Sequence, residues 1–467
     1  LNLQSDRLVP GHTTTAAEIA LSSSNRGMTL EGGARVGSVP MNGTYVQTFV
    51  PGQPSTGRLD VVLPLDRAFL DEFRIALPGG AVTGAANSRL VIDLERDQPP
   101  RFALSSDLAG AELRLDSVGW AKPSASTGAL EVRGSSTQPA TIDQLSFDAA
   151  GLVAEGTLRL GADGGFEVAS FPDLHLSDWF QGNVSLIGRG AGRSAELIVD
   201  GGSLDLRKAD FGEFAQSGAG GGGPVTVHLD KLQVSDGVAL TQFQGNFESG
   251  GGLSGRFNAR INNDAAVQGS VAPYEGRMAF RLRSDDAGGA FRSIGLLENA
   301  IGGAMELTLA PTGAPGNYAG LLQATSLRVR DAPSLAELLD AMSVIGLLQQ
   351  LDGQGINFDT VEARFTLSPD RITISESSAV GLSLGISMDG VYTLATKAMN
   401  FQGVVSPVYL LNGIGAIFTR RGEGLIGFNY RMTGTPDATE VSINPLSIFT
   451  PGMFREIFRQ PPPEPSK

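Results

Sequence analysis

Cysteine is absent from the 467 residues of this chain, which excludes disulfides, thiolate catalysis and zinc sites built on cysteine. The absence also fits an oxidising compartment, where a stray thiol is a liability. Histidine is scarce: His12, His175 and His228 lie far apart, and none has a spacing typical of metal ligands. We therefore expect no metal site and no cofactor.

Aromatic residues make up only 7% of the chain and charged residues 18%, while apolar residues reach 41%, which is too many for a disordered protein. Acidic residues exceed basic ones, and the formal net charge is -14. Phosphate binding needs clustered lysine and arginine, so this charge disfavours a nucleic-acid partner. It equally disfavours simple electrostatic adsorption to anionic lipid.

Long hydrophobic runs are missing as well. No stretch reaches the roughly 18 apolar residues of a membrane-spanning helix. The longest candidate, Val408 to Phe418, is interrupted by Asn412 and two glycines. The chain starts at Leu1 without a basic signal region, so we expect a fragment or mature form whose N-terminal portion is missing.

Glycine is abundant, at 62 residues, and it separates short segments in which apolar and polar residues alternate. These segments recur about every 10 to 15 residues, which predicts a mainly β protein built as an antiparallel meander. A sheet with one apolar face must cover it, yet few helices and few large aromatics are visible for this purpose. We therefore expect acyl chains to occupy part of the face. The residues expected to line it are Leu113, Leu115, Leu158, Leu160, Val227, Leu229, Phe257, Met278, Phe280, Leu382, Leu384 and Ile386.

A helix is predicted from Ser334 to Gln350. Ser334 and Glu337 match a capping box, and Gly353 and Gly355 end the pattern. An apolar stripe at helical spacing contains Leu335, Leu338, Leu339, Met342 and Ile345. We expect this helix to cover the apolar face near the C-terminal end, either as a fixed cover or as a movable gate.

Three shorter helices are also predicted. One spans Arg67 to Leu77 and ends at Pro78. A second follows Asp286 as its cap, with Phe291, Ile294, Leu297 and Ile301 on its apolar face. The third lies around Met453 to Phe458, before a Pro-rich tail.

Two glycine motifs suggest chemistry but fit simpler structures. Gly381 to Gly385 matches the GxSxG nucleophile elbow, yet alternation continues through it, so Ser383 is expected on the outward side of a strand. All three histidines precede Ser383, whereas a hydrolase needs one after it. Gly188 to Gly192 is followed by a strand, which indicates a hairpin turn and not a phosphate loop. We therefore expect no catalytic residues and no enzymatic activity.

Several segments together resemble the AsmA-like family of Gram-negative bacteria, nearest to its large YhdP-type members. They are SDLAGAELRLDSVGWAKP at 106 to 123, SDDAGGAFRSIGLLENAIGG at 284 to 303, and LRVRDAPSLAELLDAMSVIGLLQQLDGQGINFD at 327 to 359. GLSLGISMDGVYTL, GVVSPVYLLNGIGAIF and SINPLSIFTPGMFREIF follow in the same order. The chain departs from the family at Ala416 to Phe418 and Arg420 to Arg421, where relatives often have a proline and glycine turn.

The resemblance implies an elongated, twisted antiparallel sheet curled into an open apolar groove, with a few short helices near the C-terminal end. It implies a β-groove segment at 1–283, an AsmA-like C-terminal region with capping helices at 284–458, and a disordered tail at 459–467. Such proteins bridge the periplasm, pass phospholipid between the inner and outer membranes, and contribute to outer-membrane integrity. The family has no catalytic residues. A missing N-terminal helix would anchor the chain in the inner membrane.

Two other protein classes also show β alternation. An outer-membrane β-barrel needs aromatic girdles, for which two tryptophans and six tyrosines are few. An extracellular adhesin or β-solenoid needs a regular short repeat, and none is visible. Lipid transfer is therefore the favoured hypothesis.

Overall fold

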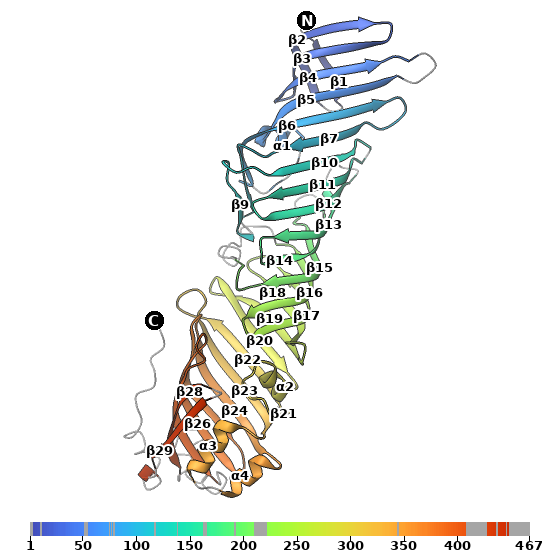
Figure 1. The fold of residues 1–467 in the computed structure, drawn as a ribbon. Coiled ribbons are helices and arrows are strands. Elements are labelled where there is room, and N and C mark those ends of the chain that lie inside the picture. The colour runs from blue at the N-terminus through green and yellow to red at the C-terminus, as the bar shows by residue number, and fades with distance from the viewer. Residues whose placement is uncertain are drawn as a thin grey trace. The chain divides into compact units, whose positions relative to one another are not determined.

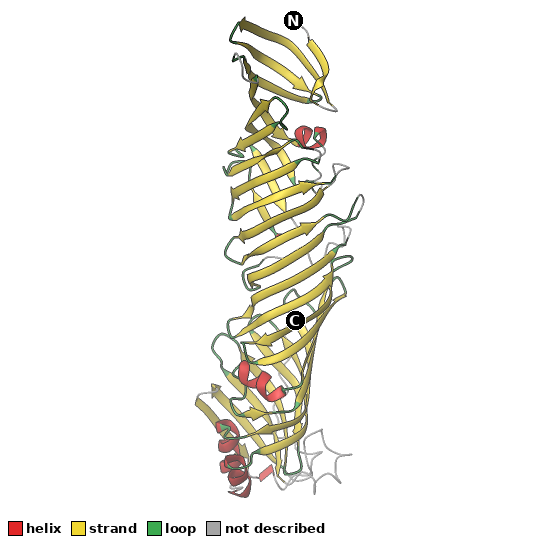
Figure 2. Cartoon of the chain, turned by 90° about the vertical axis from the view of Figure 1, so that its right-hand side faces the viewer, coloured by secondary structure: helices red, strands yellow, loops and turns green. Residues whose placement is uncertain are grey.

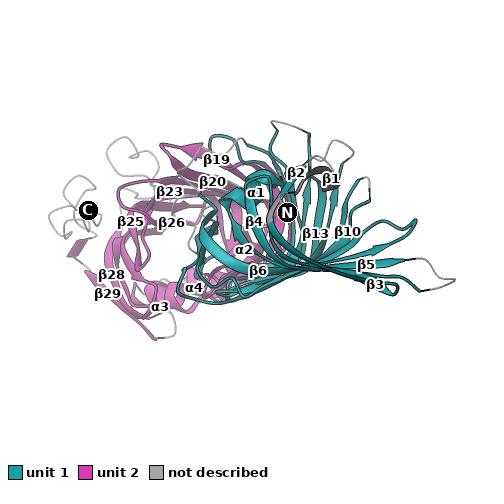
Figure 3. Ribbon diagram, turned by 90° about the horizontal axis from the view of Figure 1, so that it is seen from above, with its two compact units in different colours: residues 1–233, 248–251 teal, residues 234–247, 252–467 magenta. Residues whose placement is uncertain are grey.

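The computed structural model describes residues 3–9, 12–50, 55–73, 75, 77, 80–115, 118–137, 139–161, 166–190, 193–209, 222–342, 345–407, 427–435, 438–444 and 446–447. Strands dominate these residues, and the few helices are short (Figure 2). Contacts divide the chain into unit 1, residues 1–233 with 248–251, and unit 2, residues 234–247 with 252–467 (Figure 3). The predicted mainly β class, with an antiparallel sheet and a few short helices, is confirmed.

The described residues of unit 1 form strands β1 to β15, most of β16, and helix α1 (Figure 1). Their bounds are β1 (Leu3–Val9), β2 (His12–Ser24), β3 (Gly27–Val36), β4 (Val39–Thr48), β5 (Thr56–Asp66), α1 (Arg67–Glu72), β6 (Val82–Glu95), β7 (Arg101–Ser106), β8 (Ala111–Leu115), β9 (Trp120–Lys122), β10 (Ala129–Ser135), β11 (Thr141–Ala149), β12 (Leu152–Leu160), β13 (Phe166–Leu176), β14 (Phe180–Ile187), β15 (Glu196–Asp205) and β16 (Pro224–Ser235).

Most strands of unit 1 pair with their sequence neighbours in antiparallel ladders. The ladder runs from β1 to β7, passes from β7 to β10, and continues to β15. Strand β8 pairs with the start of β6 and with β9, which makes a small second sheet. Strands β15 and β16 are parallel, with Leu197 opposite Val225 and Asp205 opposite Gln233. This pair departs from the antiparallel expectation.

The described residues of unit 2 form β17 to β29 and helices α2, α3 and α4. Their bounds are β17 (Val238–Glu248), β18 (Ser254–Ile261), β19 (Ala265–Tyr274), β20 (Arg277–Ser284), α2 (Ala287–Ser293), β21 (Ala300–Ile301), β22 (Ala304–Pro311), β23 (Tyr318–Val329), α3 (Pro333–Ala341), α4 (Ile345–Asp352), β24 (Ile356–Leu367), β25 (Arg371–Val380), β26 (Leu384–Thr393), β27 (Met399–Pro407), β28 (Phe428–Thr435) and β29 (Ala438–Asn444). Antiparallel ladders join β18 to β19, β20, β22, β23 and then each strand to β29. The division between the units lies upstream of the boundary at 284 that the family resemblance implies.

The predicted helix from Ser334 to Gln350 consists of two helices, α3 and α4, so the expectation of one continuous helix is wrong. Its predicted capping box is also wrong. Residue Ala332 occupies the N-cap position, Pro333 supplies the first turn, and no side chain caps α3. Since α3 begins at Pro333, Ser334 lies inside its first turn and not at the N-cap position. Its hydroxyl lies 3.0 Å from the Thr439 hydroxyl of β29.

The other helix predictions fare differently. Asp286 caps α2 as predicted, with its carboxylate accepting from the Gly289 N–H at 2.8 Å. Helix α2 ends at Ser293, so of the four predicted apolar residues only Phe291 belongs to it, and Ile294, Leu297 and Ile301 lie beyond it. Helix α1 starts at Arg67 but ends at Glu72, earlier than predicted. The helix predicted at Met453 to Phe458, the stretch Val408 to Phe418 and the tail 459–467 lie outside the described residues.

The first three residues of the GxSxG stretch, Gly381 to Ser383, form a hairpin turn and are not part of a strand as the alternation suggests, whereas Leu384 and Gly385 begin β26. Strand β25 ends at Val380 and β26 begins at Leu384, with the Gly381 N–H donating to the Leu384 carbonyl at 2.9 Å. Ser383 therefore lies in the turn. Leu382 is also in the turn and is 66% exposed, so it does not continue the face of Leu384.

A buried lysine holds the small second sheet of unit 1 in place. Lys122 is fully buried, and its ammonium lies near four backbone carbonyls: Leu108 at 2.8 Å, Ala111 at 2.9 Å, Pro123 at 3.1 Å and Ser126 at 2.6 Å. An ammonium has three protons, so these four acceptors share them. The lysine therefore ties β9 to the loop before β8 and to the turn after β9.

Replacing this lysine should destabilise unit 1. We expect Lys122→Met to lower the free energy of unfolding by about 2 to 4 kcal/mol, because buried carbonyls would lose a charged donor. Chemical denaturation measures the change. Lys231→Met, at an exposed position of β16, is the control and should change stability by less than about 0.5 kcal/mol. A Lys122→Met protein as stable as the control would contradict this role.

Candidate functional site

One face of the unit 1 sheet carries a continuous row of apolar residues. Cross-strand partners lie on the same face of a sheet, so the register defines the row directly. We call it the unit 1 row. It crosses thirteen strands through Leu21, Leu30, Tyr45, Leu59, Ile92, Phe102, Gly134, Ile142, Leu158, Ala169, Leu186, Leu197 and Val225. Most of these side chains are half-buried, so the row keeps accessible apolar surface.

The opposite face of the same strands is charged. Arg58 on β5 pairs with Asp93 on β6 at 2.9 Å, and Arg159 on β12 pairs with Glu167 on β13 at 3.0 Å. Arg89 also pairs with Asp60, and its hydrogen bond lowers the pKa of the Asp60 carboxyl. Because strand residues alternate between faces, the charges and the apolar row are separated by the sheet itself.

Two groups of side chains cover other parts of the apolar face in unit 1. Helix α1 places Phe69 and Phe73 against a cluster containing Val61 and Leu63. The small second sheet packs Trp120 with a cluster from β11 to β13. Apart from Leu59, the residues of the unit 1 row lie outside these two clusters. The fold therefore fills one part of the face and leaves the row accessible.

Unit 2 also has an apolar row on its own strands, but part of it is covered. Val271 and Phe401 are only 7% and 8% exposed, and Met432 and Val441 pack against the core beneath α3 and α4. The unit 2 row crosses eleven strands through Gly255, Val271, Phe280, Leu309, Gly320, Phe365, Ile374, Gly390, Phe401, Met432 and Val441. Its opposite face is again polar: Glu306 accepts hydrogen bonds from Arg281 and Arg283. Burial acts to raise the pKa of Glu306, but the two arginine hydrogen bonds outweigh it, so the pKa lies below its ordinary value.

Helices α3 and α4, which include the Ser334 region, pack on part of the apolar face of unit 2. Leu338, Leu339 and Leu351 are at most 2% exposed and pack with Phe358, Leu384 and other strand residues in one cluster. Leu335 is partly buried in the same cluster, and Met342 is 9% exposed. The Ile345 side chain lies outside the described residues. These helices form a well-packed protein core over one part of the strands.

The predicted lining residues fall into distinct groups. Leu158, Leu160, Val227, Met278 and Phe280 are half-buried residues of strands in the main ladders.

Other members of that set are covered by protein. Leu384 is fully buried and Ile386 is partly buried in the core beneath α3 and α4. Leu229 and Phe257 are 4% and 6% exposed. Leu113 and Leu115 belong to β8 and contribute to the Trp120 cluster, so they help to cover the face. The period-two pattern identifies these residues as apolar strand residues, but it does not show what packs on them.

Sequence reasoning missed Phe102 and Ile142, which lie in the middle of the unit 1 row. Phe102 alternates with Leu104 in the segment RFALSS, so a signal was present. Ile142 gave a weaker signal, because a β-bulge between Ile142 and Leu145 shifts the alternation by one residue.

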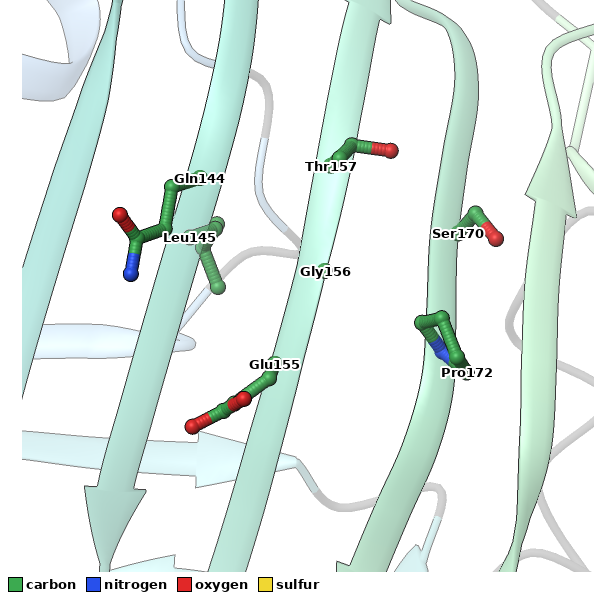
Figure 4. A pocket seen from close by; sticks show the side chains of 7 residues that line it. All are labelled: Gln144, Leu145, Glu155, Gly156, Thr157, Ser170 and Pro172. Carbon is green, nitrogen blue, oxygen red and sulfur yellow. The ribbon is translucent and has the colours of Figure 1, made fainter.

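A shallow pocket of about 220 Å³ lies over β11 to β13 (Figure 4). It is lined by Gln144, Leu145, Glu155, Gly156, Thr157, Ser170 and Pro172. This lining has one carboxylate and two hydroxyls, without a histidine or lysine to act as a base or acid beside them. Among the described residues, no group of three or more acidic or histidine side chains could hold a metal ion. The pocket therefore offers no assembled catalytic site.

Comparison of the chain with protein-family models, with curated proteins and with solved structures finds no match. The resemblance to the AsmA-like family therefore remains a hypothesis. Within the part of the chain that the structure describes, no helix is both long and apolar enough to cross a bilayer.

The pKa of Glu306 makes a pH dependence testable. A carboxylate with a lowered pKa in the folded state stabilises the protein above its unfolded pKa, and that stabilisation is lost as the pH falls through the folded value. Stability should therefore fall as the pH drops below the ordinary value of 4.5. Between pH 7 and pH 3 the free energy of unfolding should decrease in both proteins. We expect this decrease to be about 0.5 to 1 kcal/mol smaller in Glu306→Gln than in the parent, measured by urea unfolding.

The matched control is Glu275→Gln, which removes the same charge at an exposed position after β19. It should follow the parent at both pH values. If Glu306→Gln loses as much unfolding free energy as the parent between pH 7 and pH 3, then the ion pairs with Arg281 and Arg283 contribute nothing to stability.

Proposed function

We propose that this chain binds phospholipid acyl chains along its apolar rows, as part of a periplasm-spanning bridge that moves phospholipid between the inner and outer membranes. The observation that carries the proposal is the continuous apolar register in each unit, with the charged residues confined to the opposite face. Such a face needs an apolar occupant, because leaving it in water is unfavourable.

The chemistry of the face favours hydrocarbon chains. Backbone groups of the strands are already used in ladders, so an occupant of the face must be held mainly by burial of apolar surface. Each CH2 group removed from water contributes about 0.8 kcal/mol. Phospholipid head groups can remain in water at the strand ends, which avoids the cost of desolvating their charge. Acyl chains can therefore bury the apolar face without a polar group on that face to bind them.

The repeated row also suits movement. Successive strands offer similar aliphatic and aromatic side chains, so neighbouring positions have similar affinity and a bound chain can shift between them. The rows alone give no direction, since equal sites favour neither end. A directed flow would need an energy source in another component.

The periplasmic location, the inner-membrane anchor in a segment outside this chain, and the role in outer-membrane integrity rest on the family resemblance. The same resemblance supports a protein without enzymatic activity and without a cofactor. Oxidising conditions in the periplasm agree with the absence of cysteine.

Charge placed on either face of one strand tests the binding surface. Leu158 belongs to the unit 1 row, and its neighbour Thr157 is exposed on the other face of β12. We expect Leu158→Asp to weaken local lipid binding at least about tenfold, because an unpaired carboxylate resists desolvation. Native mass spectrometry would count the phospholipids carried by each protein. Thr157→Asp should carry as many as the parent.

Two outcomes would count against this assignment. If both variants carry the same lipid load as the parent, then β12 does not contact lipid. If the parent carries no lipid after detergent-free purification and does not take up phospholipid from vesicles, then the lipid-binding function itself is rejected.

The role of α3 can be tested by fixing it to the sheet. The hydroxyls of Ser334 and Thr439 lie 3.0 Å apart, so Ser334→Cys with Thr439→Cys places a disulfide between α3 and β29 in a chain without other cysteines. Because α3 belongs to a well-packed core, we expect the oxidised protein to be more stable and to transfer lipid between vesicles at the parent rate. The reduced protein is the control. Transfer blocked only after oxidation would identify α3 as a movable gate.

A further inference from the structure

In the ladders described above, five glycines on the apolar faces lie directly opposite an aromatic residue of the next strand. The pairs are Gly134 with Phe102, Gly269 with Phe257, Gly320 with Phe365, Gly390 with Phe401, and Gly403 with Tyr430. A Cβ atom added to any of these glycines would meet the ring of its partner. Each ring therefore lies over the glycine and occupies the space of its missing side chain.

The Tyr430 hydrogen bond shows how far such a ring reaches. Tyr430 is on β28, and its ring lies over Gly403 on β27. Its hydroxyl donates to the carbonyl of Ser387 on β26, at 3.0 Å. The ring must therefore extend across β27 close to the backbone. A glycine lets an aromatic side chain lie along the sheet and present its broad side outward.

Gly320 and Phe365 form the pair that is most open to test. The three atoms nearest to an added Cβ at Gly320 all belong to the Phe365 ring, and the backbone of Gly320 has no positive φ angle. An alanine would thus disturb the ring without straining the chain. Phe365 is half-buried, and its row neighbours Leu309 and Ile374 are half-buried too. Its ring can therefore touch an occupant of the face.

We propose that Phe365, held flat by Gly320, is a contact point for a linear acyl chain in the unit 2 row, and that Gly320 is the positioning residue for this ring. The proposal rests on the lipid-binding function proposed above. A flat ring offers contact over its whole face and raises no wall across the row. A straight, flexible chain can use such a low surface, whereas a packed helix needs ridges and grooves. The geometry thus favours the acyl chain of a phospholipid as the occupant.

Raising the ring should obstruct the row. In Gly320→Ala the methyl group occupies the place of the ring, so Phe365 must turn outward into the path of the acyl chain. The assay follows fluorescent phosphatidylethanolamine as it moves between vesicles that contain both phosphatidylethanolamine and phosphatidylglycerol. We expect this transfer to be at least about fivefold slower than with the parent, which is equivalent to about 1 kcal/mol in the barrier. Phe365→Leu should transfer within about twofold of the parent, since leucine remains apolar and low.

The double variant separates the ring from the glycine. In Gly320→Ala with Phe365→Leu no ring is present to be displaced, so transfer should return to the rate of Phe365→Leu. If the double variant is as slow as Gly320→Ala, the ring is not the cause, and the proposal is wrong. Parent-like transfer by Gly320→Ala would overturn it as well.

Two glycine controls account for stability and for the substitution itself. Gly269→Ala makes the same clash with Phe257, which is only 6% exposed, so it should lower the melting temperature without a specific block of the unit 2 row. Gly237→Ala, where an added Cβ meets nothing within 4 Å, should behave as the parent. Slowing by Gly269→Ala equal to that by Gly320→Ala would assign the effect to destabilisation and overturn the proposal.

A direct contact measurement distinguishes failure of this inference from failure of the proposed function. Phe365→Trp places a fluorescent ring at the contact point, and phospholipid with brominated acyl chains should quench its added emission. If the parent transfers no lipid but the tryptophan is quenched, the transfer function is rejected, whereas contact between residue 365 and acyl chains is supported. If the parent binds lipid and the tryptophan is not quenched, the contact point is rejected and lipid binding stands.

Discussion

Cross-strand register is the constraint on which the rest of this structure depends. Strand side chains alternate between faces, so a slip of one residue would move an entire apolar set to the charged side. In unit 1 the register keeps Phe102, Ile142 and Leu158 on one face, while Arg58 and Arg159 stay on the other. In unit 2 the same rule places Leu309, Gly320 and Phe365 in one row. The function proposed for the chain follows from this separation of apolar and charged faces.

The elements that pack on the apolar faces determine how much of each face is left for a ligand. Helix α1, the small second sheet and helices α3 and α4 each bury apolar strand residues in ordinary protein cores. These cores stabilise the strands by burying apolar side chains. They also leave less apolar surface exposed, and a large exposed apolar face would favour association between copies of the protein. They also limit the surface left for a ligand. Glycines opposite aromatic rings shape what remains, because the rings lie over them.

Much of the candidate site could be predicted from the alternation of residues. The segments around Leu158, Val227 and Phe280 are strands with apolar residues on one side, as the sequence indicates. Prediction failed where one local sequence pattern is compatible with two different structures. Ser383 continues an alternating run, yet it belongs to a turn closed by the Gly381 N–H. Ser334 fits a capping box, yet Pro333 starts α3 and the Ser334 hydroxyl lies beside Thr439.

The sequence by itself determined the mainly β class, the apolar positions of the strands, the Asp286 cap and the lack of thiol chemistry. These follow from local rules: period-two alternation, a capping carboxylate and composition. Only the tertiary structure decided that Leu384 is core whereas Leu158 remains accessible, that Lys122 is buried among carbonyls, and that Phe365 lies over Gly320. Each of these depends on contacts between residues distant in sequence, and no local pattern records which residues will meet.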